Sequence, residues 1–248
     1  SPIYLPAGAV LIDSAGWRVA IRVFALVALC GALQAAYFAR NGSSDETGGA
    51  SASAFKALRA AIHRPNVRRM LLAYAFAGFS FSTLLVYQVP IMIDQGLVLS
   101  TAAAIAGFRG FCQLFGRVGV IAALAKQEAA FALRVSYLLA AFGSLFILGG
   151  NVGLGVVYGA LVGTSLGATT PLQAIHAQET FEPEDLGLLM GLQHSVFALA
   201  GGVGPVVAGF AADLTDSQSP TVWMTMCSLL VAALLLRGKP LRPVVEIR

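Results

Sequence analysis

Long apolar runs alternate with short polar segments along the chain, and this pattern predicts helices that cross a membrane. A membrane span needs about 20 mostly apolar residues. Complete spans are predicted over residues 17–38, 70–93, 99–124, 131–150, 152–177, 186–210 and 221–236, of which the last is slightly short. The apolar stretch 3–12 cannot cross roughly 30 Å of hydrocarbon at about 1.5 Å per residue. We interpret it as the end of a truncated helix, which predicts that the chain is a fragment.

A polar segment and a basic segment separate the first complete span from the second. Residues 41–53 are rich in Gly and Ser, which predicts a flexible linker. Residues 54–69 are basic and place Phe55, Leu58 and Ile62 at helical spacing. This spacing predicts a short amphipathic helix on the membrane surface, with a solvated basic loop as the alternative.

Composition agrees with a membrane protein. Hydrophobic residues make up 57% of the chain and charged residues only 11%, whereas a soluble domain carries about 25% charged residues. The net charge of +4 would fit a nucleic-acid-binding protein. The basic residues, however, cluster at the ends of apolar runs without interleaved aromatic residues, so we expect no nucleic-acid partner. Cys30, Cys112 and Cys227 lie inside apolar runs and predict no disulfide framework.

Basic residues also predict the orientation of the spans. The linker, the loop after residue 124 and the C-terminal tail hold most of the Lys and Arg residues, and these segments fall on one side of the predicted membrane. Because cytoplasmic loops carry an excess of Lys and Arg, the linker and the tail are expected in the cytoplasm. We expect a multi-pass protein of the bacterial inner (plasma) membrane.

Arg109 is the strongest candidate functional residue, because it lies within the otherwise apolar run 99–124. A charge at mid-membrane depth costs roughly 3 kcal/mol on insertion scales. Helical spacing places Gln113 and Arg117 on the same face as Arg109. No acidic residue of the sequence lies at comparable depth. We therefore interpret Arg109 as part of a water-filled path or an anion site. The alternative is a structural ion pair with a residue outside this chain.

Other polar side chains within the spans could complete a substrate site. The expected substrate-binding residues are Arg109, Gln113, Tyr87, Gln88, Thr83 and Thr164. His194 and His176 are candidate proton relays, with an ordinary hydrogen-bonded histidine as the alternative for each. The sequence has no phosphate-binding loop, no paired carboxylates within a span and no metal-ligand spacing of Cys and His, so we expect no enzyme, cofactor or metal site.

Glycines spaced by four residues mark two of the spans. A ridge of small residues lets helix backbones approach closely, and a proline within a span usually kinks it. We expect helix packing, and a role in gating, for Gly155, Gly159, Gly163, Gly167, Pro171, Gly201 and Pro205. Packing without gating is the alternative.

Several short motifs, in order, resemble the major facilitator superfamily of transporters. The sequence QETF at 178–181, the glycines of GLLMG at 187–191 and the stretch GGVGPVVAGFAADLTDS at 201–217 resemble its tenth-to-twelfth helix region. GWR at 16–18 resembles the start of its sixth helix, and the basic ALRAAIHRPNVRRM stretch resembles the lead-in to its seventh. Gly116-Arg117 resembles the end of the eighth. The resemblance covers nearly the whole chain.

The resemblance implies an all-α membrane protein that forms the C-terminal half of such a transporter. Residues 1–40 would be the end of helix five and helix six, 41–69 the cytoplasmic linker, 70–237 a six-helix C-terminal bundle and 238–248 a cytoplasmic tail. The N-terminal half of the same transporter would be the partner. An arginine in helix eight resembles the monocarboxylate and oxalate/formate branches, where it binds a carboxylate, and this implies that role for Arg109.

The function expected from the sequence is secondary active transport of a small organic anion, such as a monocarboxylate, by alternating access. Symport with protons is only a hypothesis, since no carboxylate of this half is suited to carrying the proton. Three alternatives stay open. The chain could belong to an exporter of hydrophobic compounds or to a non-transporting membrane receptor or assembly protein, or it could be a natural half-size protein that dimerises.

Overall fold

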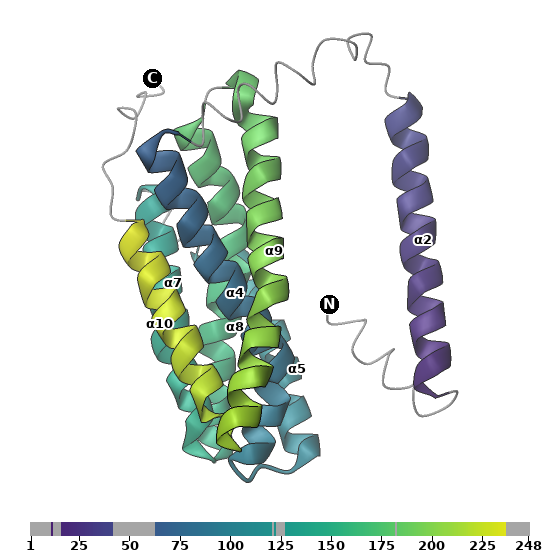
Figure 1. Cartoon of the computed structure of the whole chain (residues 1–248), viewed down its shortest axis with the longest axis vertical. Coiled ribbons are helices and arrows are strands. Elements are labelled where there is room, and N and C mark those ends of the chain that lie inside the picture. Colours follow the sequence, from purple (N-terminus) through teal and green to yellow (C-terminus); the bar gives the residue numbers. More distant parts are fainter. Residues whose placement is uncertain are drawn as a thin grey trace. The chain divides into compact units, whose positions relative to one another are not determined.

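The computed structural model describes residues 11, 16–41, 63–120, 122, 127–181 and 183–236. Within these residues the regular structure is helical and contains no strand. The chain divides into two compact units, Ser1–Lys56 and Ala57–Arg248. The first unit contains α2, which spans Trp17–Asn41 (Figure 1). The predicted flexible linker, most of the predicted amphipathic helix and the tail 238–248 lie outside the described residues.

The second unit is a bundle of long helices joined by short connections. Its elements are α4 (Pro65–Asp94), α5 (Leu99–Phe115), the π-helix η1 (Gly116–Val120), α7 (Ala129–Leu145), the 3₁₀-helix η2 (Phe146–Gly149), α8 (Val152–Thr180), α9 (Pro183–Thr215) and α10 (Ser219–Leu235). Successive long helices run in opposite directions (Figure 1). Within the described residues, four helices are long and apolar enough to cross a membrane: Pro65–Asp94, Ala129–Gly149, Val152–Thr180 and Leu186–Thr215.

The predicted span 99–124 is not one continuous α-helix. α5 ends at Phe115 and continues as the π-helix η1. At this point Gly116 lies so close to α8 that a Cβ atom would meet the backbone carbonyl oxygen of Thr164. The hydrophobic pattern carries no signal for such a change of helix type, because both forms present apolar side chains. The last predicted span, 221–236, corresponds to the shorter apolar helix α10.

Local sequence explains several helix ends. Asn151 caps α8, because its side-chain oxygen accepts a hydrogen bond from the backbone N–H of Leu154 at 2.9 Å. Gly150 precedes this cap with a φ of 63°, a conformation that favours glycine, and it packs against the carbonyl oxygen of Gln95 at the end of α4. These contacts join the end of η2 to the end of α4.

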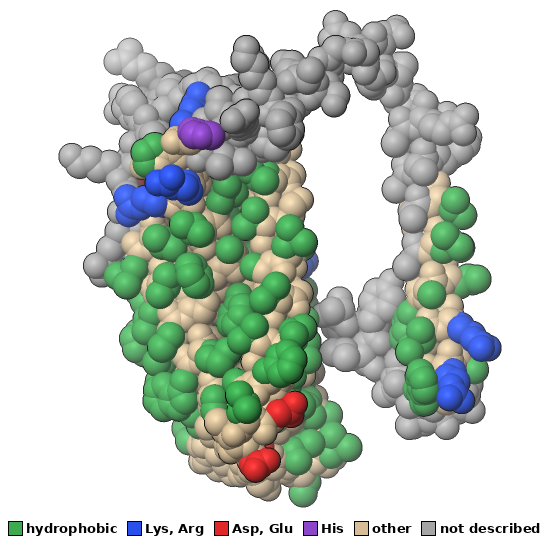
Figure 2. All heavy atoms as spheres, viewed as in Figure 1, with side chains coloured by type: hydrophobic (Ala, Val, Ile, Leu, Met, Phe, Trp, Pro, Cys, Tyr) green, Lys and Arg blue, Asp and Glu red, His purple; other side chains and the backbone are tan. Residues whose placement is uncertain are grey.

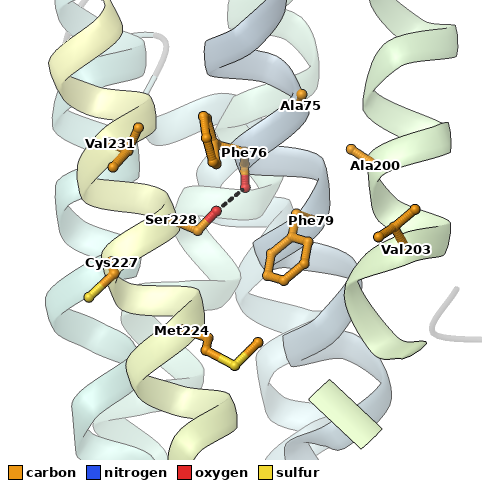
Figure 3. A pocket seen from close by; sticks show the side chains of 9 residues that line it. All are labelled: Ala75, Phe76, Phe79, Ala200, Val203, Met224, Cys227, Ser228 and Val231. Atoms are coloured by element: carbon orange, nitrogen blue, oxygen red, sulfur yellow. Dashed lines mark hydrogen bonds between the residues drawn. The ribbon is translucent and has the colours of Figure 1, made fainter. Parts of the chain in front are cut away.

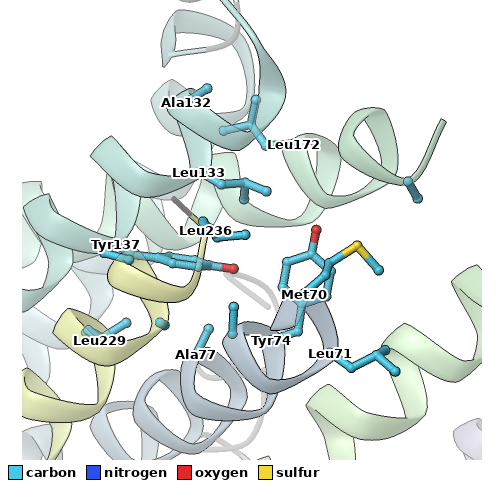
Figure 4. Close-up of a cluster of buried hydrophobic side chains, with 14 of the residues drawn as sticks. Met70, Leu71, Tyr74, Ala77, Ala132, Leu133, Tyr137, Leu172, Leu229 and Leu236 are labelled. Atoms are coloured by element: carbon cyan, nitrogen blue, oxygen red, sulfur yellow. The ribbon is translucent and has the colours of Figure 1, made fainter. Parts of the chain in front are cut away.

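The interior of the bundle is apolar and so is much of its outside. The larger core cluster combines side chains of α4, α7, α8, α9 and α10, several of which are drawn in Figure 4. On the outside, hydrophobic side chains cover most of the visible face of the bundle, whereas Lys and Arg lie near one end and acidic residues near the other (Figure 2). Large exposed side chains such as Leu199 and Phe210 have no apolar cover within the described residues. An apolar exterior of this kind fits a lipid environment.

The long helices of the second unit form two inverted repeats of three helices each. α4 of one repeat packs extensively on α9 of the other, and α8 in turn packs extensively on α5. In the same way, α10 packs on α4, and α7 packs on α8. α7 and α10 pack on each other, while the α4–α5 and α8–α9 contacts are small. Exchanging α4, α5 and α7 for α8, α9 and α10 therefore reproduces these contacts, although α9 also packs on α10 while α5 and α7 hardly meet. α4 and α8 run in opposite directions, so the second repeat is inverted relative to the first (Figure 1).

The closest backbone contacts of the two repeats correspond residue by residue. A Cβ atom on Gly163 of α8 would meet the carbonyl oxygen of Arg109 on α5. A Cβ atom on Gly78 of α4 would meet the carbonyl oxygen of Phe197 on α9 in the same way. The repeat thus relates Gly78 to Gly163, and Phe197 to Arg109.

A second pair of contacts has the same register. A Cβ atom on Gly116 would meet the carbonyl oxygen of Thr164, and one on Gly204 would meet that of Phe79. Phe79 and Thr164 are the same number of residues apart as Gly78 and Gly163. Gly116 and Gly204 are likewise the same number of residues apart as Arg109 and Phe197. Two independent contacts therefore fix one alignment of the repeats.

Candidate functional site

Arg109 is enclosed between α5, α4 and α8, with only 2% of its side chain exposed. Its Nε donates a hydrogen bond to Oε1 of Gln88 on α4 at 2.8 Å. The Gln88 side chain is also buried, and its Nε2 donates to the carbonyl oxygen of Leu85 at 3.1 Å. This second bond fixes the amide with its oxygen toward the guanidinium. Of the predicted substrate residues, Gln88 is the one that the structure joins to Arg109.

Tyr158 of α8 is a buried polar residue that the sequence analysis did not single out. Its side chain is fully buried, and its hydroxyl has no hydrogen-bond partner among the described residues. Within the described residues no hydrogen bond joins this hydroxyl to Arg109, and the ring packs in an apolar cluster with side chains that include Leu84 and Ile105. Tyr158 directly precedes Gly159 of the glycine ridge, so a polar aromatic side chain beside a close helix contact was the signal in the sequence.

The charge of Arg109 has no acidic counterpart within the described part of the chain. No carboxylate among the described residues forms an ion pair with its guanidinium, whose Nε donates to Gln88. Nε is occupied by Gln88, whereas neither terminal nitrogen has a hydrogen bond to a described residue. Among the described residues, the guanidinium therefore has a neutral amide and no carboxylate as its hydrogen-bond partner.

The glycine ridge of α8 holds Arg109 in place through the backbone. The predicted ridge faces α5, where Gly155 meets Ile105, Gly159 meets Phe108, Gly163 meets the Arg109 carbonyl and Gly167 meets the Gln113 carbonyl. With no side chains between the two backbones, α5 lies directly on α8. On the other repeat, Gly201 packs against Ser82 of α4. α8 and α9 continue through Pro171 and Pro205.

The remaining predicted substrate residues do not join Arg109 by hydrogen bonds within the described structure. The hydroxyl of Tyr87 packs against Gly209 of α9. Thr83 donates to the carbonyl oxygen of Phe79 in its own helix at 2.7 Å. Gln113 and Thr164 are half-buried; the backbone carbonyl of Gln113 meets Gly167 of α8, and that of Thr164 meets Gly116 of η1.

The two histidines that were predicted as proton relays occupy different environments. His176 Nδ1 shares a hydrogen bond of 2.6 Å with the hydroxyl of Tyr74 on α4, which is fully buried. His194 is exposed on α9, and its Nδ1 lies 2.9 Å from the carbonyl oxygen of Met190 in the same helix. Within the described residues no hydrogen bond links the two rings.

A separate apolar groove opens between α4, α9 and α10, with a volume of about 580 Å³ (Figure 3). Phe76 and Phe79 form its wall on α4, and Met224 and Cys227 line it on α10. Ser228 also lines the groove, but its hydroxyl donates to the carbonyl oxygen of Phe76 at 3.0 Å. The groove therefore offers an apolar surface with its one hydroxyl already bonded.

No protein-family model and no curated protein sequence matches the chain. Its function is therefore inferred from its own residues and from the packing of its helices.

Proposed function

We propose that the chain is the C-terminal half of a secondary active transporter of the major facilitator type, which moves a small organic anion by alternating access. The observation that carries this proposal is Arg109, a cation enclosed among apolar helices and without an acidic partner in the described residues. An intramembrane charge is expensive and is kept where it serves a site. A bound anion would supply the missing opposite charge.

The inverted repeats support this class of protein. Nested repeats of three plus three helices with inverted topology occur in each half of major facilitator transporters, whose substrate sites lie near the bilayer midplane. The packing of the helices and the register of their closest contacts support the proposal. In the proposed arrangement the linker and the tail are cytoplasmic, and the N-terminal half supplies the other side of the substrate path.

Uptake measurements on the full-length protein test the role of Arg109. Arg109→Gln should abolish uptake of labelled monocarboxylates into cells or proteoliposomes, because the amide keeps some hydrogen bonding but removes the charge. The matched control is Arg117→Gln, which removes an exposed arginine from the adjoining η1 and should retain uptake. Expression and melting temperature in detergent establish that each variant is folded. Normal uptake by folded Arg109→Gln protein would refute the assignment.

The apolar groove favours a second candidate, the export of hydrophobic compounds. Its lining by Phe76, Phe79 and Met224 suits an uncharged, apolar molecule better than an anion. A substrate screen in intact cells separates the two functions, because export lowers the accumulation of apolar dyes and should be insensitive to Arg109→Gln.

A further inference from the structure

We propose that the groove between α4, α9 and α10 holds one acyl chain of an anionic phospholipid, whose phosphate is bound by Arg68 and Arg64 at the basic end of α4. In the proposed orientation this end faces the cytoplasm, and the cytoplasmic leaflet is the one that carries anionic lipids. The proposal concerns a bound lipid and is independent of which substrate the protein transports.

The groove opens on the outside of the bundle, where the helices of a membrane protein meet lipid. Phe76, Val203 and Val231 line it and are all exposed. Among its described lining residues the one hydroxyl, that of Ser228, donates to the carbonyl oxygen of Phe76. The volume of about 580 Å³ falls within the roughly 300–1,000 Å³ of pockets that hold small molecules. Such a surface suits a hydrocarbon.

The groove runs along the helices, as an acyl chain does in a bilayer. On α10 its lining extends from Met224 to Val231 (Figure 3), which corresponds to about 10 Å at the rise of an α-helix. On α4 it extends from Ala75 to Phe79. An extended chain aligned with the membrane normal would therefore lie against both helices at once.

One face of α4 leads from the groove to two arginines. Arg64, Arg68, Leu72, Ala75 and Phe79 follow one another at spacings of three or four residues, which places them on the same side of the helix. Leu72 is exposed, so apolar surface continues from the groove toward Arg68. Both arginines are exposed, and neither side chain has a hydrogen bond or an ion pair within the described part of the chain.

The distance along α4 matches the length of a lipid tail. Arg68 and Phe79 are 11 residues apart, which is about 16 Å along a helix. The hydrocarbon core of a bilayer is about 30 Å thick, so this distance is close to the depth of one leaflet. A phosphate beside Arg68 therefore places the end of its acyl chain at the groove, near the middle of the bilayer.

Charge selects an anionic headgroup over a zwitterionic one. A guanidinium binds phosphate through two parallel N–H bonds. Phosphatidylcholine carries a second, cationic group that the two arginines repel, whereas phosphatidylglycerol has a net negative charge. The acidic residue of α4, Asp94, lies at the opposite end of the helix and does not offset the arginines.

Native mass spectrometry of the purified full-length protein tests the headgroup contact, because it resolves each bound lipid by mass. The unmodified protein should bind one dioleoylphosphatidylglycerol more tightly than dioleoylphosphatidylcholine. A basic residue near an anionic lipid surface corresponds to about a fivefold change in affinity. Arg68→Gln should therefore reduce the preference for phosphatidylglycerol by about fivefold, and the double variant with Arg64→Gln by about 25-fold. The matched control is Arg117→Gln, an exposed arginine of η1, which packs on α5 and α8, and it should leave the preference unchanged.

Ala75→Phe tests the groove itself, because the added ring occupies the place of the acyl chain. It should lower the affinity for phosphatidylglycerol at least as much as Arg68→Gln does. Cys227→Trp narrows the groove from α10 and is a second filling variant. The control is Ala198→Phe, at an exposed position of α9 that does not line the groove, and it should have no effect. Melting temperatures in detergent establish that each variant is folded.

Several outcomes would overturn the proposal. Equal affinities for the two lipids, unchanged by Arg68→Gln, would show a groove that accepts any apolar molecule. Glycerophosphoglycerol, the headgroup without acyl chains, should bind far more weakly than the lipid, and equal binding would show a phosphate site unconnected to the groove. A dimer that forms only without phosphatidylglycerol would show that a second copy occupies the groove. Unchanged lipid binding by folded Ala75→Phe and Cys227→Trp would refute the acyl-chain contact. The uptake assay with Arg109→Gln is separate from all of these measurements, so either proposal can fail without the other.

Discussion

Replacing Gln88 by Met should destabilise the bundle by depriving a buried cation of its hydrogen-bond acceptor. The bond from Arg109 Nε is 2.8 Å long, and both side chains are buried. Hydrogen bonds between neutral groups of membrane helices average only about 0.6 kcal/mol. Those to charged groups contribute about 1.5–3 kcal/mol. Since the donor here is charged and enclosed, we expect Gln88→Met to lower the free energy of unfolding by about 2 kcal/mol.

A double-mutant cycle distinguishes this bond from general packing. Arg109→Met removes the charge, so the double variant leaves no buried cation without an acceptor and should be more stable than Gln88→Met alone. Unfolding of the purified protein is followed by circular dichroism in mixed micelles with increasing sodium dodecyl sulfate. Gln113→Met is the control, because this half-buried amide has no side-chain hydrogen bond in the described structure. Single effects that add to the double effect within about 0.5 kcal/mol would refute the reasoning.

Two further predictions concern packing and access. Gly163→Ala places a methyl group against the backbone carbonyl of Arg109 and should cost about 1–3 kcal/mol in the same unfolding assay. Gly191→Ala, where the Cβ meets no described atom within 4 Å, should be neutral or slightly stabilising, so equal losses would contradict the close contact. In membranes, a small lipid-soluble maleimide should label exposed Cys227 much faster than buried Cys112, and an apolar compound seated in the groove should slow only the first reaction. If apolar compounds do not change the rate at which Cys227 is labelled, ligand binding in the groove is refuted.

The hydrophobic pattern predicted the helices well because bilayer thickness and helix rise fix how long an apolar run must be. The glycine spacing likewise predicted a close helix contact, since only small residues allow one. α4, however, begins at Pro65 and not at residue 70. Proline is accommodated in the first turn of a helix, and the basic residues that follow it can continue the helix beyond the apolar run.

The candidate site was harder to predict, because spacing along one helix does not determine which neighbour a side chain meets. Tyr87 and Gln88 are adjacent in sequence, yet the hydroxyl of Tyr87 faces Gly209 on α9 while the amide of Gln88 faces Arg109 on α5. Tyr158 is buried against residues of α4 and α5 only through the packing of α8 on these helices. Which neighbour each side chain meets depends on tertiary structure, and the position of Tyr158 beside Gly159 was only an indirect signal in the sequence.

The repeat packing also divides the bundle into two layers, one of α4, α9 and α10 and the other of α5, α7 and α8. Contacts within each layer are extensive, whereas the layers meet chiefly through α7 and α10. Several side-chain hydrogen bonds cross the seam between the layers: Arg109 with Gln88, Tyr74 with His176, Gln193 with the carbonyl oxygen of Gln173, and Arg134 with the carbonyl oxygen of Leu236. Because its carbonyl rests on Gly163 of the same layer, Arg109 must move together with α8. The α7–α10 contact is thus placed to act as a hinge, and the bonds of Gln88, Tyr74 and Gln193 across the seam are those that its opening would break.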